Sequence, residues 1–99
     1  MDKSFYALSN VEIVKSLGVR FKEYRKRMGL SQKEIAEQTG LSVFTISTFE
    51  SGKTTGLTLV SMIKMLRAIE ELEQVQNILP ELPESPQELF RKQSKTAKR

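Results

Sequence analysis

Two short helices joined by a tight turn are predicted near the middle of the chain, and this arrangement constrains the fold most. Ser31 and Glu34 match the Ser-x-x-Glu pattern that caps the first turn of a helix. Gly40 suits the left-handed backbone conformation that ends a helix. Ser42 can cap a second helix, which we expect to end at Gly52. The sequence therefore predicts a helix, a turn and a second helix in direct succession.

The apolar residues of this segment, residues 31–52, are those that two crossing helices need. Ile35 and Ala36 are expected to point inward, and the small side chain of Ala36 allows the helices to cross closely. Leu41, directly after the turn, and Ile46 are expected to fix the second helix to a core. The outer face of that second helix is then free to enter a DNA major groove.

Amphipathic helices are predicted on both sides of this segment. A capping box at Ser9 and Glu12 begins a helix that ends at Gly29. Its apolar stripe consists of Val11, Val14, Leu17 (or Gly18), Phe21, Tyr24 and Met28. Apolar periodicity continues over residues 57–69 and again over residues 72–79. No segment alternates convincingly with a period of two, so we expect an all-α fold of five helices.

The composition argues against an enzyme. The chain of 99 residues has no cysteine and no histidine, which excludes thiolate metal sites and the commonest acid–base group at neutral pH. Gly52-Lys53-Thr54 lacks the earlier glycine that a phosphate-binding loop requires, because position 47 is serine. We therefore expect no enzymatic activity, no cofactor and no metal.

Charge is distributed unevenly along the chain. Residues 1–69 carry 11 basic and 6 acidic residues, residues 70–89 carry 6 glutamates and no Lys or Arg, and residues 90–99 carry 5 basic residues and no acid. Net basicity favours an anionic partner such as nucleic acid, although ordinary solubility charge would look the same.

No apolar run is long enough to span a membrane. We expect a cytoplasmic, nucleoid-associated protein.

Several segments resemble the Cro/lambda-repressor (XRE) family of helix-turn-helix regulators. They are LGVRFKEYR at residues 17–25, GLSQKEIA at residues 29–36, TGLS at residues 39–42 and TISTFESGK at residues 45–53. The resemblance covers residues 17–69 and implies an all-α, five-helix, lambda-repressor-like domain that binds double-stranded DNA.

The resemblance also implies roles for individual residues. Gln32 occupies the position of a glutamine that contacts a phosphate and braces the recognition helix, and Lys53 occupies that of a contact to the DNA backbone. Glu50 matches a family acid that is structural rather than base-reading. The candidate DNA-contacting residues are Arg20, Arg25, Gln32, Ser42, Val43, Phe44, Thr45, Ser47, Thr48 and Lys53.

The expected base-reading positions depart from the family pattern. The family often has Arg, Lys or Gln at one or more of three positions that here are Val43, Phe44 and Thr48. Bidentate Arg–guanine and Gln–adenine contacts are therefore not available from them. We expect apolar contacts with thymine methyls, hydroxyl contacts from Thr45, Ser47 and Thr48, and a preference for T-rich half-sites. Phe44 could instead be a core or dimer aromatic, and the basic residues of the first helix could be a solvated face.

Three regions are expected: an N-terminal arm (1–9), a helix-turn-helix domain with C-terminal dimerisation helices (10–79), and a Pro-containing, basic, flexible tail (80–99).

Between Leu57 and Leu79 there are more apolar residues than one small domain can bury, and such a surplus marks an interface. We expect a homodimer whose recognition helices lie about 34 Å apart, one turn of DNA. The tail would attract phosphates, bind a partner or remain a solvated end.

These features favour a transcriptional repressor that binds an operator as a dimer. The overall form, a compact domain followed by a Leu/Glu segment, a Pro-containing stretch and a basic tail, also resembles antitoxin-like regulators encoded beside HipA-type kinases. Such regulators bind their own operator and sequester the kinase. The alternative is a protein-interaction module that uses the same fold without specific DNA binding.

Overall fold

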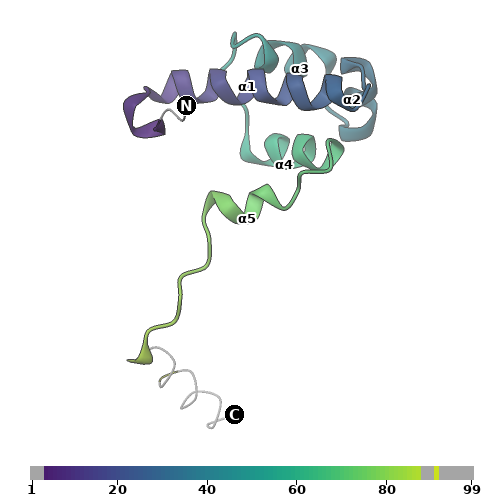
Figure 1. The fold of residues 1–99 in the computed structure, drawn as a ribbon. Helices are drawn as coiled ribbons and strands as arrows, with labels where there is room; N and C mark the ends of the chain where they lie inside the picture. Colours follow the sequence, from purple (N-terminus) through teal and green to yellow (C-terminus); the bar gives the residue numbers. More distant parts are fainter. Residues whose placement is uncertain (1–3, 88–90, 92–99) are drawn as a thin grey trace.

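The computed structural model describes residues 4–87 and 91. These residues form helices and no strand, which confirms the predicted all-α class (Figure 1). The elements are the 3-10 helix η1 (Phe5–Ala7) and the α-helices α1 (Asn10–Arg27), α2 (Gln32–Thr39), α3 (Val43–Glu50), α4 (Leu59–Ala68) and α5 (Gln74–Ile78). No helix among the described residues is long and apolar enough to cross a membrane.

Local capping signals explain where the first helices begin and end. The Ser9 and Ser31 hydroxyls each accept a hydrogen bond from the backbone N–H three residues later, and a glutamate at that later position accepts one from the serine N–H. Gly29 and Gly40 follow α1 and α2 with φ angles of 73° and 78°, which side chains other than glycine rarely adopt. Both predicted capping boxes and both glycine stops are confirmed.

The helices surround one small core. In Figure 1, α4 lies below the long helix α1, and α5 lies below α4. The fully or nearly buried apolar residues come from α1, α2, α3 and the α4 region, and they are Phe21, Ile35, Ile46, Phe49, Met65 and Ile69. The rings of Phe21 and Phe49 pack with their centroids 6.1 Å apart. The predicted inward positions of α2 and α3 are therefore confirmed.

Gly18, which is buried in the middle of α1, allows α1 and α3 to approach closely. A Cβ atom at this position would overlap the carbonyl oxygen of Phe49 and lie 3.0 Å from its carbonyl carbon. The separation between the two helices is therefore set by the absence of a side chain at residue 18.

Several elements differ from the expectations. The fifth helix is shorter than residues 72–79, and Leu79 is exposed. Val11, Tyr24 and Met28 of the predicted α1 stripe are also exposed, so the buried part of that stripe is its middle, at Gly18 and Phe21. Residues 86, 87 and 91 are helical, so regular structure begins again at Pro86, within the segment that we expected to be a flexible tail. Proline is well tolerated in the first turn of a helix, where its missing N–H would have no partner.

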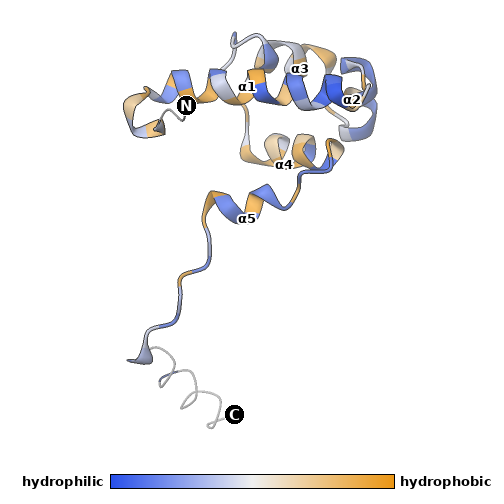
Figure 2. Cartoon of the chain, viewed as in Figure 1, coloured by the Kyte–Doolittle hydropathy of each residue, from blue (hydrophilic) through white to orange (hydrophobic). Residues whose placement is uncertain are grey.

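Hydrophobic residues continue beyond the compact core. Figure 2 shows them along α4 and at the end of α5. Leu59 and Val60 at the start of α4 are more than half exposed, as are Ile78 and Leu79. This end of the fold therefore presents apolar surface that the described residues do not cover.

Candidate nucleic-acid interface

Helix α3 has one buried face and one exposed face. Ile46, Phe49 and Glu50 are buried, whereas Phe44 is 75% exposed. Residues at steps of three and four lie on the same side of a helix. The side of α3 that carries Phe44 therefore also carries Ser47, Thr48 and Ser51, and we call these four residues the outer stripe.

The three hydroxyl groups of the outer stripe are hydrogen-bonded to carbonyls of their own helix. Ser47 Oγ donates to Phe44 O at 3.2 Å, and Thr48 Oγ1 donates to the same oxygen at 2.8 Å. Ser51 Oγ donates to Thr48 O at 3.3 Å. A hydroxyl has one proton and two acceptor lone pairs. Because the proton is used within the helix, each of these oxygens can accept a hydrogen bond from a donor outside the protein but has no proton left to donate.

The first turn of α3 is fixed by a serine cap. Ser42 Oγ accepts a hydrogen bond from Thr45 N at 3.0 Å, and the two hydroxyl oxygens lie 2.9 Å apart. Val43, the first residue of the helix, is 43% exposed. The Ser42 side chain thus holds the helix start in place, and Val43 extends the apolar surface next to Phe44.

A buried ion pair attaches α3 to α1. Arg25 Nε and Nη2 donate to the two carboxylate oxygens of Glu50 at 2.6 and 2.8 Å, and Nη1 donates to Leu30 O at 2.9 Å. The hydrogen bond with Glu50 raises the pKa of Arg25 above its already high ordinary value. Arg25 is only 7% exposed. The expectation that Arg25 contacts a phosphate is therefore corrected: its guanidinium is occupied inside the protein.

Gln32 connects the start of α2 to the same ion pair. Its Nε2 atom donates to Glu50 Oε1 at 3.0 Å, and its side chain is half-buried. Glu50 thus accepts hydrogen bonds from residues of α1 and α2 while lying on α3. A side chain at the N-terminus of α2 therefore helps to fix the orientation of α3.

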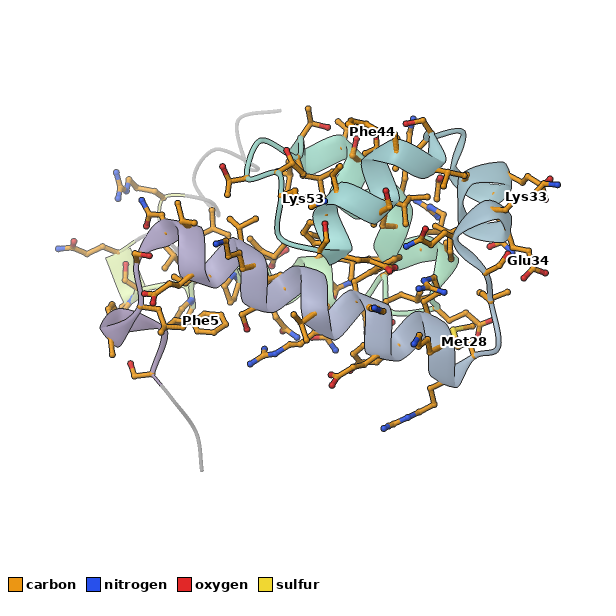
Figure 3. All side chains as sticks on the ribbon, turned by 90° about the horizontal axis from the view of Figure 1, so that it is seen from above. Phe5, Met28, Lys33, Glu34, Phe44 and Lys53 are labelled. Atoms are coloured by element: carbon orange, nitrogen blue, oxygen red, sulfur yellow. The ribbon has the colours of Figure 1, made fainter. Side chains whose placement is uncertain are left out.

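An open hollow of about 900 Å³ lies beside the outer stripe. It is bordered by α1, α2, α3, the loop after α3 and the start of α4. The lining residues are Lys22, Gln32, Phe44, Thr45, Ser47, Thr48, Glu50, Ser51, Lys53, Thr54, Gly56, Leu57, Thr58 and Ser61. Figure 3 shows Phe44 and Lys53 on the same side of the domain, with Phe5 at the far end of α1.

A comparison with protein-family models matches residues 21–72 to the family HTH_3, described as helix-turn-helix. The matched residues include α2, the turn at Gly40 and α3, and they make up more than half of the chain. The chain belongs to this helix-turn-helix family. No curated protein and no solved structure matched the chain in two further comparisons.

The helix-turn-helix domain brings only some of the predicted contact residues together. Those that line the hollow are Gln32, Phe44, Thr45, Ser47, Thr48 and Lys53. Ser42 and Val43 lie at the start of α3, outside that lining. Two arginines are elsewhere: Arg25 is buried, and Arg20 has its guanidinium carbon 5.4 Å from the centre of the Phe5 ring.

The position of Arg20 follows from helix geometry. Successive residues of an α-helix are rotated by about 100°, so residues two apart point in nearly opposite directions. Arg20 lines a separate groove between α1, α4 and α5, whereas Lys22 lines the hollow beside α3. The structure thus places Lys22 at the hollow and Arg20 away from it, a difference that the sequence alone does not show because it does not reveal which side of α1 faces α3.

Other polar residues at the hollow were not anticipated. Thr54, Thr58 and Ser61 come from the loop after α3 and the start of α4. The Thr58 hydroxyl caps α4 by accepting from Ser61 N at 3.0 Å. The Thr58 cap at the start of the helix that follows α3 is the sequence signal that could have identified this edge of the hollow.

Proposed function

We propose that this helix-turn-helix protein is a transcriptional repressor that binds a double-stranded DNA operator as a homodimer, with α3 in the major groove. The single observation that carries the proposal is the outer stripe of α3, whose four residues line an open hollow together with Lys22, Gln32 and Lys53. A recognition helix needs this arrangement, because its outer side chains must reach base edges while polar and cationic neighbours contact the phosphates.

The roles of individual residues follow from their positions. Val43, Phe44 and the hydroxyl-bearing residues of α3 are placed to contact base edges. Lys22 and Lys53 are exposed cations at the hollow, suited to phosphates on either side of the groove. Gln32 has two roles. Its Nε2 atom donates one hydrogen bond to Glu50, and the second N–H of the same amide is available to a phosphate.

Dimerisation is assigned to the opposite side of the domain. A groove of about 280 Å³ lies between α1, α4 and α5, and Leu17, Met62 and Leu66 are among its lining residues. The exposed Ile78 and Leu79 at the end of α5 extend this apolar surface. A second copy that covered it would remove the surface from water. To bind two half-sites one DNA turn apart, such a dimer has to present its two α3 helices about 34 Å apart.

A gel shift across a salt series tests the DNA-binding function. A protein that neutralises phosphates releases counterions, so log K should fall against log salt with a slope of about −0.9 per contacted phosphate. DNA from upstream of the protein's own gene is the first probe. Absence of any shift at about 50 mM salt would refute the proposal. Sedimentation giving a monomer at tens of micromolar protein would refute the dimer separately.

The antitoxin role is a narrower form of the same proposal. It adds a HipA-type kinase that the regulator sequesters, and it is motivated by the Pro-containing stretch that follows α5. Co-purification of this chain with the product of a neighbouring kinase gene tests it. Failure of the purified pair to co-elute would leave a repressor without a kinase partner.

The exposure of Phe44 favours a second candidate function. A phenylalanine that is 75% exposed, next to the exposed Val43, would suit an apolar pocket on a partner protein. In that case α3 would bind protein and the domain would not bind DNA specifically. The same gel shift separates the two candidates, because a domain that binds only protein through α3 gives no shift at about 50 mM salt.

A further inference from the structure

We propose that the outer stripe of α3 reads base pairs that present a 5-methyl group together with an exocyclic amino group in the major groove. The expected targets are T·A pairs, and a 5-methylcytosine·G pair should substitute for T·A where an unmethylated C·G pair does not. This inference rests on the proposed function, and it adds the chemical features of the base pair that the site selects.

The apolar part of the readout comes from the first turn of α3. Phe44 is 75% exposed, and the exposed Val43 lies next to it. Neither side chain can donate or accept a hydrogen bond. The C5-methyl group is the apolar feature of base edges in the major groove, and among the four standard bases thymine alone carries it. A buried methyl contact is therefore the favourable interaction that this pair of side chains can make with a base.

The polar part of the readout accepts hydrogen bonds rather than donating them. The hydroxyl protons of Ser47, Thr48 and Ser51 are all used for carbonyls of α3, at 3.2, 2.8 and 3.3 Å. The lone pairs that remain on these oxygens are suited to amino groups, which adenine presents at N6 and cytosine at N4. They are unsuited to the O6 and N7 atoms of guanine, which are both acceptors.

The two parts together distinguish the base pairs. A T·A pair supplies a methyl group and an adenine amino group on one edge. A C·G pair supplies an amino group without a methyl, and its guanine places two acceptors in front of the stripe. Methylation of cytosine at C5 adds the missing methyl beside the amino group of the same base. The outer stripe contains no Arg or Lys that would donate hydrogen bonds to guanine O6 and N7 instead.

The test uses the full chain and a short duplex selected by the protein from random DNA. Each thymine is replaced in turn by uracil, which lacks the methyl, and each adenine by purine, which lacks the amino group. We expect uracil to weaken binding by about fourfold at each contacted methyl, which corresponds to one buried methylene-sized group. A C·G pair at the same position should bind more weakly than T·A, and 5-methylation of that cytosine should restore most of the loss.

Two pairs of variants assign the readout to residues. Phe44→Ala should abolish the difference between thymine and uracil, and it should not unfold the protein because this side chain is exposed. Tyr6→Ala is the matched control, since Tyr6 is a fully exposed aromatic on η1. Thr48→Val should reduce the discrimination between adenine and purine, whereas Thr48→Ser keeps the hydroxyl and should retain it.

The outcomes separate this inference from the function on which it rests. Salt-sensitive DNA binding with equal affinity for thymine and uracil duplexes would overturn the methyl readout and leave the DNA-binding function standing. A selected site in which guanine is required opposite α3 would overturn the acceptor readout in the same way. Failure to bind every duplex at about 50 mM salt would overturn both.

Discussion

The close approach of α1 and α3 at Gly18 makes Gly18→Ala the sharpest test of the fold. The added Cβ would overlap Phe49 O and lie 3.4 Å from the Cα atom of Glu50. A carbon and a carbonyl oxygen in contact are separated by about 3.3 Å, so the two helices would have to separate by on the order of 1 Å. The obstacle is backbone of α3 and not a flexible side chain, so a change of rotamer cannot relieve it.

Two opposing contributions decide how much Gly18→Ala changes the free energy of unfolding. Alanine is favoured over glycine in a helix interior by about 1 kcal/mol. Overpacking of a well-packed core costs about 1–3 kcal/mol, and the rigid obstacle at Gly18 places this substitution at the upper end of that range. The net expectation is a loss of about 2 kcal/mol in the free energy of unfolding. For a domain of this size the melting temperature should fall by roughly 10 °C.

Thermal and urea unfolding, followed by circular dichroism, measure this loss. Gly56→Ala is the matched control, because a Cβ at Gly56 would meet no atom within 4 Å. It should leave stability unchanged or raise it by a few tenths of a kcal/mol. If Gly18→Ala were as stable as the unsubstituted protein, helix propensity would outweigh packing at this position. The inferred close contact between α1 and α3 would then be wrong.

Three further predictions concern charged residues. Arg25→Ala leaves the buried Glu50 carboxylate without its cation, so the free energy of unfolding in urea should fall by about 3–5 kcal/mol. Lys53→Ala should weaken binding to every duplex alike and reduce the salt slope measured by fluorescence anisotropy by about 0.9. The pKa of Glu34 lies below its ordinary value of 4.5, because the Ser31 backbone N–H and hydroxyl donate to its carboxylate. Its stabilising effect is complete above pH 4.5 and is lost as the pH falls through the lowered pKa, so Glu34→Gln should flatten the acid side of the stability curve.

Matched variants give each of these predictions a control. Arg20→Ala removes an exposed arginine from the same helix as Arg25 and should cost less than about 1 kcal/mol; a similar cost for both would contradict the buried pair. Lys33→Ala removes an exposed lysine that does not line the hollow, so it should leave the salt slope unchanged. Glutamine at position 34 can keep the capping hydrogen bond. The free energy of unfolding at neutral pH should therefore be retained. If the loss of stability at acid pH were the same with glutamine as with glutamate, the Glu34 carboxylate would not be its cause.

The parts of the fold that depend on neighbouring residues could be predicted from the sequence. Ser9, Ser31 and Ser42 each bond a backbone N–H three residues later, so the cap and its target lie in one short stretch of chain. Gly29 and Gly40 likewise mark helix ends by their own backbone conformation. These signals need no knowledge of the tertiary structure, and they gave α1, α2 and α3 with bounds close to those observed.

The parts that depend on tertiary contacts could not be predicted in the same way. Arg25 belongs to a run of three consecutive basic residues near the end of α1, and its partner Glu50 follows 25 residues later. Its spacing of four from the buried Phe21 separates it from the exposed Lys26 and Arg27, but the local sequence does not reveal its partner on α3. Similarly, the choice between Arg20 and Lys22 depends on the side of α1 to which α3 packs. The sequence therefore predicted which side of α3 is buried, and it could not predict which side chains of α1 lie beside the hollow.

The division of α3 into a buried and an exposed face has a consequence for the evolution of this protein. Ile46, Phe49 and Glu50 hold the helix in place, and none of them belongs to the outer stripe. Mutations at positions 44, 47, 48 and 51 can therefore accumulate without removing a core contact or the ion pair to Arg25. After gene duplication, one copy could acquire a different target site through a few substitutions while remaining folded throughout. The same separation allows an experimenter to randomise the four positions and to attribute the changes in binding to the new side chains.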